Sequence, residues 1–298
     1  MKIRIGFGLG TRTLTNDREK FDPLLDALEG LGFDSLWLSE RIGGECPDPV
    51  VGMAYAAGRT KRIKFGASVM VLPGRNPALL AKEMASLDRL SGGRLLPAFG
   101  LGIRDEHEQM AFGVQRNQRA KIFDEVLPLL RRIWTEDSVD HEGEFYSYND
   151  LRVEPKPQQK PMEVWLGGAS PAELRRVGRL SDGWLPSFCT PAIAAEGWKV
   201  INEVADDHDR QIEEDHFGAL VPYTHGELNP PTIELLKRRA PDSDPNDIIP
   251  VGWDGLREQL ERFIEAGASK FVPVLVGEPD NWTDELEGVA AACLPLHN

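Results

Sequence analysis

Short apolar runs alternate with amphipathic helical segments along most of the chain. The runs are rich in β-branched and aromatic residues and are bounded by turn-forming residues, which is typical of buried parallel strands. Strands are predicted at 3–10, 35–40, 64–71, 95–102, 162–168, 183–188, 216–223 and 270–278. Helical patterns separate them, so we predict one α/β domain over residues 1–298, folded as a single (β/α)8 barrel, the TIM barrel, with insertions.

Three helices can be described further from their caps and spacing. Asn16 or Asp17 is the expected cap of the first helix, and Asn76 precedes Pro77 at the start of the helix after the third strand. Apolar side chains three or four residues apart are assigned to the core face of each helix. On the first helix they are Phe21, Leu24, Leu25 and Leu28. On the helix that begins at Pro77 they are Leu79, Leu80, Met84, Leu87 and Leu90, and on a helix over about 118–134 they are Ile122, Val126, Leu129, Leu130 and Ile133.

Two segments depart from the alternation of strand and helix. Residues 140–160 contain a short aromatic run between polar turns and prolines, which predicts a β-hairpin inserted across the barrel. Residues 226–252 are dense in Pro and Asp. This second segment is either a mobile lid over the barrel mouth or a surface loop without that role.

Composition and charge exclude several classes of protein. Lys and Arg total 34 and Asp and Glu total 48, so the net charge is 34 − 48 = −14, which opposes binding to nucleic acid or anionic membranes. The apolar runs are too short to span a membrane and the start lacks a secretory signal, so we expect a soluble cytoplasmic protein. Cys46, Cys189 and Cys293 lie far apart, which predicts buried thiols rather than a disulfide framework or a zinc site.

Three stretches carry a resemblance to a known family. They are GFDSLWLSER (Gly32 to Arg41), the run from Ala67 to Gly102 that begins ASVMVLPGRNP, and VWLGGASPAELRRVGRLSDGWLPSF (Val164 to Phe188). Their order and spacing are similar to those of the bacterial luciferase-like monooxygenase superfamily, whose members bind FMN or the deazaflavin coenzyme F420 in a (β/α)8 barrel. The compact length resembles the F420-dependent oxidoreductase branch. The resemblance also implies a small-molecule substrate and, frequently, a homodimer.

The resemblance implies where the cofactor ring would lie. In the family, a non-proline cis peptide ends the third strand beneath the ring, and the aligned bond joins Ser68 to Val69. The family places the ring edge at the close of the fourth strand, where glycines permit a close approach, although simple turning from strand to loop explains these glycines almost as well. The ring-binding residues so assigned are Ala67, Ser68, Val69, Gly100, Leu101 and Gly102.

A seat for the anionic tail of the cofactor is predicted after the fifth strand. Gly167, Gly168 and Ala169 precede a helix that opens with a Ser-Pro pair, so amide groups and a helix amino end would face a phosphate. Ser187, at the end of the sixth strand, is expected to add a hydroxyl.

Glu40 and Arg41 are the candidate catalytic residues, although they depart from the family pattern. Many members have an Asp-His pair at this point, and a guanidinium cannot act as a base near neutral pH. Arg41 can instead hold an anionic intermediate or a ring carbonyl, while an ion pair between Glu40 and Arg41 that braces the loop is the alternative. Ile103 is a second departure, because the family's sugar-phosphate dehydrogenases have a glutamate acid there. Other arginines expected at the mouth are Arg12, Arg75 and Arg104.

The preferred hypothesis is an oxidoreductase that transfers a hydride between coenzyme F420 and a small organic substrate. The alternative within this class is an FMN-dependent monooxygenase that takes reduced flavin from a partner reductase and uses oxygen. A barrel that binds the cofactor without turnover also remains open, because the Asp-His pair and the glutamate acid are absent. A metal-assisted hydrolase is disfavoured, since the histidines show no metal-ligand spacing and no metal site is predicted.

Overall fold

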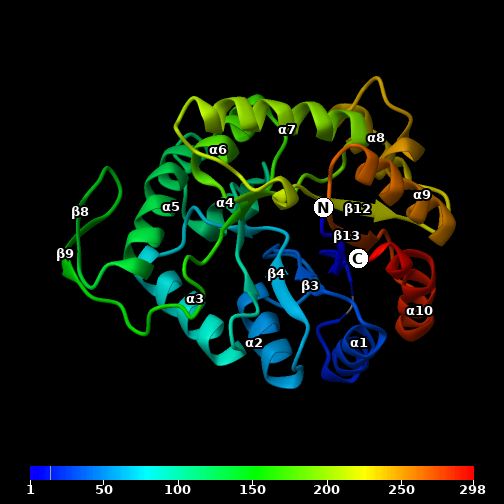
Figure 1. Cartoon of the computed structure of the whole chain (residues 1–298), viewed down its shortest axis with the longest axis horizontal. Helices are drawn as coiled ribbons and strands as arrows, with labels where there is room; N and C mark the ends of the chain where they lie inside the picture. Colours follow the sequence, from blue (N-terminus) through cyan, green and yellow to red (C-terminus); the bar gives the residue numbers. More distant parts are fainter. Residues whose placement is uncertain (14) are drawn as a thin grey trace.

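The computed structural model describes residues 1–13 and 15–298, and its strands surround a central axis with helices outside them (Figure 1). The strands of the barrel are β1 (Arg4–Ile5) continued by β2 (Phe7–Leu9), β3 (Ser35–Leu38), β4 (Lys64–Ala67) continued by β5 (Met70–Val71), β6 (Leu95–Leu96) continued by β7 (Ala98–Gly100), β10 (Trp165–Leu166), β11 (Gly183–Trp184), β12 (Gly218–Tyr223) and β13 (Lys270–Leu275).

Parallel pairing closes these strands into a ring. β13 pairs with β12 on one side and with β1 and β2 on the other, and the ladder continues from β2 through β3 and β4 to β6. β7 then pairs with β10, and β10 with β11. Isolated parallel bridges from Trp184 to Phe217 and from Ser187 to Leu220 complete the circle. The predicted (β/α)8 barrel is therefore confirmed, with the carboxyl ends of its strands at one mouth.

Helices cover the outside of the ring. They are α1 (Arg18–Leu31), α2 (Pro49–Arg59), α3 (Pro77–Ser91), α4 (Glu106–Phe112), α5 (Arg119–Thr135), α6 (Pro171–Leu180), α7 (Pro191–Asp206), α8 (Pro230–Arg239), α9 (Gly252–Glu265) and α10 (Trp282–Cys293), with short 3-10 turns at η1 (Glu214–His216), η2 (Pro245–Asp247) and η3 (Leu294–Leu296). Proline is the first residue of α2, α3, α6, α7 and α8, where its missing N–H costs nothing. Asn76 caps α3 as predicted, because its Oδ1 accepts the N–H of Leu79 at 3.1 Å.

The buried faces predicted for α1 and α5 are confirmed, but the face predicted for α3 is wrong in part. Every core residue assigned to α1 and α5 is buried. On α3, Leu80, Met84 and Leu87 are buried, whereas Leu79 is 65% exposed and Leu90 is 87% exposed. At 3.6 residues per turn, these two leucines lie roughly 120° to 140° around the helix from Met84, so they point to solvent.

A buried carboxylate lies within the core face of α3. Asp88 is fully buried and accepts hydrogen bonds from the N–H groups of Gln158 (2.7 Å) and Gln159 (3.0 Å) and from the Gln159 side-chain amide (2.7 Å). These donors offset the cost of removing the charge from water. Asp88 thereby fixes the connection that leads to β10, a role that no hydrophobic pattern predicts.

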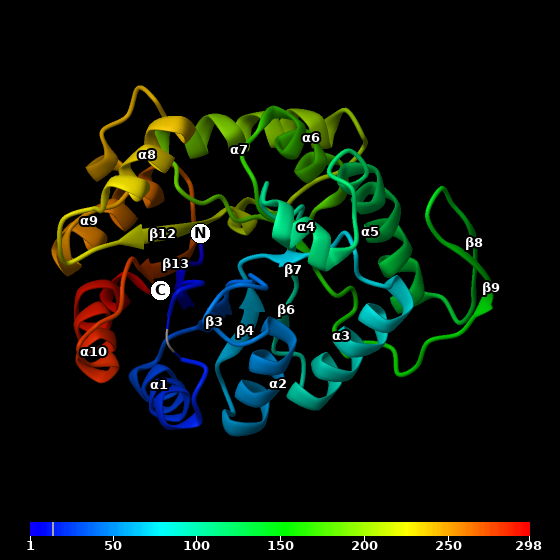
Figure 2. The same cartoon turned by 180° about the vertical axis from the view of Figure 1, so that it is seen from behind.

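An antiparallel pair of strands lies in the segment for which a hairpin is predicted. β8 (Val139–Glu142) pairs with β9 (Ser147–Leu151). The hairpin stands outside α5, at the edge of the molecule, so the expectation that it crosses the barrel is wrong (Figures 1 and 2). Glu125 of α5 holds it there, because its carboxylate accepts the N–H groups of Phe145 (3.0 Å) and Tyr146 (2.9 Å).

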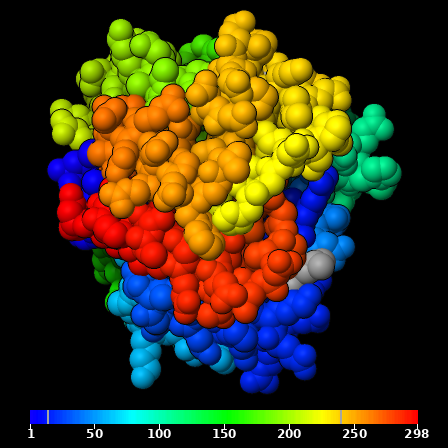
Figure 3. Space-filling model, turned by 90° about the vertical axis from the view of Figure 1, so that its right-hand side faces the viewer, coloured from blue at the N-terminus to red at the C-terminus, as the bar shows by residue number. Residues whose placement is uncertain are grey.

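Residues 226–252 carry α8 and a small apolar cluster of their own. Its buried members are Leu236, Ala240, Ile248 and Ile249. Phe188 and Val276, which follow β11 and β13 at the mouth, pack against this cluster. The segment therefore lies beside the barrel mouth, and in the view of Figure 3 its yellow and gold atoms lie next to α9 (orange) and above α10 (red). Its movement as a lid stays a prediction.

The inside of the barrel is an apolar cluster distinct from the core between strands and helices. Its buried members are Trp37, Ala98, Leu185, Leu220, Val272 and Val274, with Val69, Leu96 and Trp165 packed against them. Large rings meet glycines inside the barrel. A Cβ on Gly66 would lie 2.8 Å from the Trp37 ring, and one on Gly183 would lie 2.4 Å from the Trp165 ring. The interior is therefore filled by side chains below its mouth.

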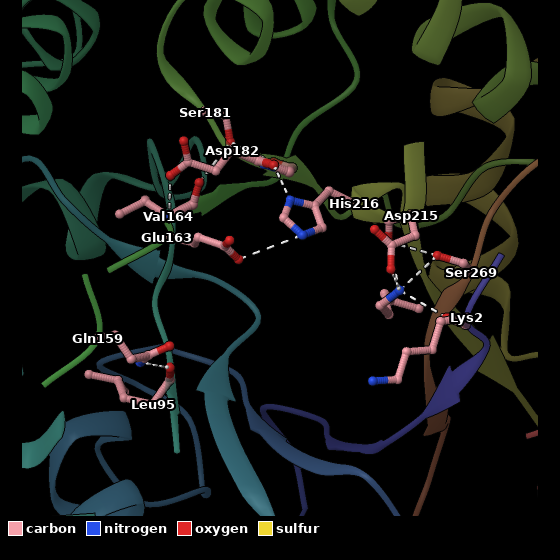
Figure 4. Close-up of polar contacts among 12 residues, drawn as sticks. Lys2, Leu95, Gln159, Glu163, Val164, Ser181, Asp182, Asp215, His216 and Ser269 are labelled. Atoms are coloured by element: carbon pink, nitrogen blue, oxygen red, sulfur yellow. Dashed lines mark hydrogen bonds and ion pairs between the residues drawn. The ribbon is translucent and has the colours of Figure 1, made fainter. Parts of the chain in front are cut away.

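Polar contacts close the amino end of the barrel (Figure 4). His216 lies between the Asp182 carbonyl, 2.7 Å from its Nδ1, and the Glu163 carboxylate, 3.6 Å from its Nε2. Lys270 donates to the Asp215 carboxylate at 3.0 Å, and burial lowers the pKa of this lysine. In this fold the amino end serves stability and the carboxyl end carries chemistry.

The two ends of the chain also meet at the amino end of the barrel (Figure 1). Asn298 Oδ1 accepts the N–H of Ile3 at 2.9 Å, and Asn298 Nδ2 donates to the Met1 carbonyl at 3.2 Å. The N–H of Ile5 donates to Nε2 of His297 at 2.6 Å.

The cysteines are buried, as predicted. None of them forms a disulfide within the described residues, and burial raises the pKa of the Cys293 thiol to about 12. In the same part of the chain, we find no helix that combines the length and the apolar character needed to cross a membrane.

Candidate active site at the barrel mouth

Val69 lies between two of the glycines that were assigned to the cofactor. A Cβ on Gly100 would be 2.5 Å from Val69 Cγ2, and a Cβ on Gly167 would be 3.1 Å from Val69 Cγ1. The two glycines therefore make room for the Val69 side chain, which packs on the interior cluster. Together the three residues form what we call the ring platform, an apolar surface suited to one face of a flat aromatic ring.

The peptide bond between Ser68 and Val69 is cis, as the family resemblance implies. It separates β4, which pairs with β3, from β5, which pairs with β7. The Ser68 N–H donates to the carbonyl of Leu38 at 2.8 Å, but its Oγ is buried without a hydrogen-bond partner in the described part of the chain. An unsatisfied hydroxyl beside an apolar platform fits a ligand whose ring has a polar edge. The residues present therefore fit a flavin or deazaflavin ring.

Glu40 fixes the backbone that follows the cis peptide. Its carboxylate accepts the N–H of Val71 at 2.5 Å and forms an ion pair with Arg75, and Arg75 Nε donates to the Val71 carbonyl at 3.0 Å. The Glu40 side chain is only 3% exposed. Burial raises the pKa of its carboxyl, and the opposite charge of Arg75 counters that effect. Glu40 is thus engaged with the backbone after the ring platform.

Arg41 does not pair with Glu40, so the alternative of an ion pair between these neighbours is wrong. Its Nε lies 3.7 Å from the Glu108 carboxylate of α4. Glu108 also accepts the N–H groups of Ile42 and Gly43, each at 3.3 Å. These contacts tie the loop after β3 to α4 and leave the Arg41 side chain 40% exposed.

Arg119, the first residue of α5, holds the loop after β7. Its Nη1 donates to the carbonyls of Leu101 (3.3 Å), Gly102 (3.1 Å) and Ile103 (2.8 Å). Gly102 has a φ of +76°, a conformation that favours glycine. Arg119 is only 9% exposed, burial lowers its pKa, and its Nε has no partner among the described residues. Nothing in the surrounding sequence marks this arginine as buried.

The predicted anion seat is bonded to a carboxylate of the chain itself. Glu173, in the first turn of α6, accepts the N–H groups of Ala169 (3.2 Å) and Ser170 (2.9 Å). Gly168 has a φ of +93°, and a Cβ there would lie 2.6 Å from the Glu173 carboxyl carbon. Ser170 and Glu173 form a capping box, and the S-x-x-E spacing of the sequence is the signal that could have predicted it.

The other residues assigned to the mouth lie at the expected end of the barrel. Ser187 follows β11 and is bridged to Leu220. Arg12 and Arg104 are exposed and make no hydrogen bond or ion pair with any residue that the structure describes. Across residues 1–13 and 15–298, no group of three or more His, Cys, Asp or Glu side chains is placed to hold a metal ion.

The sequence profile of the luciferase-like monooxygenase family matches residues 5–227. Since this match covers most of a chain that folds as the expected barrel, with the cis bond and the ring platform at its mouth, the chain belongs to this family, and it is an oxidoreductase. The resemblance stated from the sequence is therefore confirmed.

Curated relatives and solved structures agree with this assignment. The chain is 30% identical over 288 residues to an F420-dependent glucose-6-phosphate dehydrogenase of Amycolatopsis mediterranei (strain U-32). The alignment covers 82% of this chain and 84% of the relative. An F420-dependent secondary alcohol dehydrogenase, solved with an F420-acetone adduct, has the same fold with a TM-score of 0.80, 17% identity and 100% of both chains covered. The FMN complex of the oxygenating constituent of 3,6-diketocamphane monooxygenase from Pseudomonas putida superposes with a TM-score of 0.78 at 19% identity, over 100% of this chain and 99% of that one.

Proposed function

We propose that the protein binds coenzyme F420 at the barrel mouth and transfers a hydride between this deazaflavin and a small organic substrate. The observation that carries the proposal is the ring platform together with the buried hydroxyl of Ser68, which no described residue meets with a hydrogen bond. The name of the Amycolatopsis relative, F420-dependent, supports the deazaflavin over FMN. When bound, the deazaflavin ring supplies a carbon centre that gives or accepts a hydride.

The chain's own residues position that ring. Val69 would support one face of it, and Ser68 Oγ would bond to its polar edge. Glu40 and Arg75 fix the backbone of Val71 and act as positioning residues for the platform. Catalytic roles for Glu40 and Arg41, in contact with the reacting atoms, stay predictions.

We propose further that the substrate is not a sugar phosphate oxidised by the acid and base found in that branch of the family. Arg41 and Ile103 stand where that branch has its histidine and glutamate. The Arg41 side chain is 40% exposed and Ile103 is 39% exposed, so both are open to a substrate at the mouth. An arginine and an isoleucine favour a substrate with an anionic or carbonyl group next to an apolar part.

A fluorescence titration with F420 and with FMN side by side tests the cofactor. We expect saturable binding of F420 and at least tenfold weaker binding of FMN, a difference of about 1.4 kcal/mol. Gly100→Ala should weaken F420 binding strongly, because its Cβ would lie 2.5 Å from Val69 and displace the platform. Gly58→Ala is the matched control, since a Cβ at this position on α2 meets nothing within 4 Å.

Turnover then separates the candidate functions. Alcohols are offered with oxidised F420 and aldehydes with reduced F420 under anaerobic conditions, and oxygen uptake is followed with reduced FMN. Tight binding of FMN alone, with oxygen uptake, would establish the monooxygenase instead. Binding of F420 without oxidation or reduction of any substrate would favour a barrel that binds the cofactor without turnover, and binding of neither cofactor would overturn the proposal.

A further inference from the structure

A carboxylate of α5 contacts both arms of the hairpin. Glu125 accepts the N–H groups of Phe145 (3.0 Å) and Tyr146 (2.9 Å), and its Oε1 lies 3.1 Å from Nε2 of His141 on β8. The Glu125 side chain is 12% exposed. Burial raises the pKa of this carboxyl, but the hydrogen bonds with His141 and with the two amides outweigh burial, so the pKa is lowered. Each arm of the hairpin is therefore held by α5 itself, and not only by the turn that joins the two arms.

The side chain of Tyr146 connects the hairpin to the loop that follows β5. Its hydroxyl donates to the carbonyl of Arg75 at 3.2 Å. Its ring stacks on that of Tyr148, with centroids 6.5 Å apart and planes at 12°, and both rings pack against the core between strands and helices. Burial raises the pKa of the Tyr146 hydroxyl, so it keeps its proton at neutral pH. Figure 2 shows the hairpin on the same side of the molecule as α3, which begins two residues after Arg75.

A second element, α4, packs closely on the loop over residues 72–76. Gly74 has a φ of +99°, and a Cβ there would lie 2.4 Å from the carbonyl oxygen of Phe112, the last residue of α4. Within the loop, the Arg75 N–H donates to the Leu72 carbonyl at 3.3 Å, and Asn76 caps α3. Contacts with α4 and with the hairpin therefore both define where this loop lies.

Arg75 connects this loop to the ring platform. Its Nε donates to the Val71 carbonyl at 3.0 Å, and its guanidinium pairs with Glu40, which accepts the Val71 N–H at 2.5 Å. Val71 lies opposite Gly100 of the platform in the pairing of β5 with β7. A continuous series of contacts therefore leads from the Tyr146 hydroxyl through Arg75 to the backbone beside the platform.

We propose that Tyr146 is a positioning residue for the cofactor ring, an inference that rests on the proposed function. Its hydroxyl bonds to the main chain of Arg75, so it determines how the guanidinium of this arginine meets Glu40 and Val71. Without that bond the loop gains conformational freedom, and cofactor binding must then overcome the cost of ordering the platform. The role therefore concerns the affinity for the cofactor and not a chemical step, because the hydroxyl is already bonded to the backbone.

Backbone hydrogen exchange tests this role without cofactor. Tyr146→Phe keeps the ring and removes only the hydroxyl, so the hairpin should stay packed. We expect the amides over residues 69–76, the Val71 N–H among them, to exchange about fivefold faster than in the wild type. Tyr55→Phe is the matched control, because it removes a hydroxyl that donates to Asp22 at 2.5 Å from an exposed position on α2. The control should leave the exchange over 69–76 unchanged.

A fluorescence titration with F420 tests the consequence for binding. Tyr146→Phe should raise the Kd about fivefold, whereas Tyr55→Phe should not change it. Arg75→Gln should also raise the Kd, and adding Tyr146→Phe to it should cause little further rise, because the contact through which Tyr146 acts is then already lost. Urea unfolding of the same variants reports any general loss of stability.

The inference and the proposed function can fail separately. An unchanged Kd in Tyr146→Phe would overturn the inference, even if the free energy of unfolding falls, and would restrict this tyrosine to supporting the hairpin. Unchanged exchange over residues 69–76 would also overturn it, because the backbone beside the platform would then not depend on the hydroxyl. Additive effects of Tyr146→Phe and Arg75→Gln on the Kd would exclude the contact with Arg75 as the cause. All three results leave the proposed function standing, whereas failure of the wild type to bind F420 would overturn both.

Discussion

Ser68 carries a buried hydroxyl that has no hydrogen-bond partner among residues 1–13 and 15–298. Ser68→Ala removes this buried polar group, so the free energy of unfolding without cofactor should rise by about 1 kcal/mol. The affinity for F420 should fall by about fivefold, because the same hydroxyl then makes no bond to the ring. Urea unfolding and fluorescence titration measure the two changes. A loss of both stability and affinity would mean that Ser68 supports the fold and not the ligand.

Glu40 and Arg75 form a partly buried ion pair, 3% and 19% exposed, that fixes the backbone next to the ring platform. Glu40→Gln leaves the guanidinium without its counter-ion, so we expect a loss of about 2 kcal/mol in the free energy of unfolding. Adding Arg75→Gln should recover part of this loss, and urea unfolding of both single variants and the double variant measures the coupling.

Arg238 and Glu234, whose side chains are 72% and 67% exposed, form the control pair. Arg238→Gln should change the free energy of unfolding by less than about 0.5 kcal/mol. Equal effects at the buried and the exposed pair would contradict a positioning role for Glu40.

Only the parts of the candidate site that lie within a local sequence motif could be predicted from the sequence. The family pattern located the cis bond at Ser68 and the neighbouring glycines, because backbone geometry follows the local sequence closely. The partner of Glu40 lies 35 residues away, and no spacing rule connects two such positions. Arg119 was missed for the same reason, since its acceptors are carbonyls 16 to 18 residues earlier.

At the scale of the element, α3 contains two leucines that were both predicted to be buried, and only one of them is buried in the structure. Leu87 is 6% exposed and Leu90 is 87% exposed. Leu87→Ala should lower the free energy of unfolding by about 3 kcal/mol, because it leaves a cavity against the core. Leu90→Ala should change it by less than about 0.5 kcal/mol. Urea unfolding of the two variants measures both changes. Comparable losses of unfolding free energy at both positions would mean that Leu90 is buried in an interface with another chain.

The elements themselves were largely predictable, and their boundaries and placement were not. α1 and α5 bury the expected residues because their apolar positions occupy a narrow arc. α3 buries Asp88 and exposes Leu90, since small and polar residues complete its core face. The strand predicted over 162–168 shortens to β10, because only Trp165 and Leu166 enter the ladder. The hairpin was misplaced because its position depends on contacts with side chains of α5, among them Glu125 and Arg132, that the sequence of the hairpin does not reveal.

At the scale of the whole molecule, the buried thiol of Cys293 makes the free energy of unfolding fall at alkaline pH. The pKa of Cys293 is raised by burial from its ordinary 9.0 to about 12. The stabilisation from this group is complete below pH 9.0 and is lost as pH rises toward 12, because the unfolded thiol ionises first. One unit above the ordinary pKa, the loss should be about 1.4 kcal/mol.

Cys293→Ala isolates this contribution. Its free energy of unfolding should fall less between neutral pH and one unit above the ordinary thiol pKa, by the same ~1.4 kcal/mol. Urea unfolding of both proteins at the two pH values provides the comparison. Parallel pH profiles would show that Cys293 titrates normally in the folded protein.

The contact between Asn298 and the first residues of the chain has a practical consequence for the connectivity of the barrel. A short linker can join the present ends, and the chain can be reopened in the turn between β8 and β9, outside α5. Such a circular permutant keeps every barrel strand and both sides of the mouth, so it should bind F420 with unchanged affinity in the same titration. The order in which the chain visits the eight strands would then differ from the natural one, while the cofactor would meet the same surface.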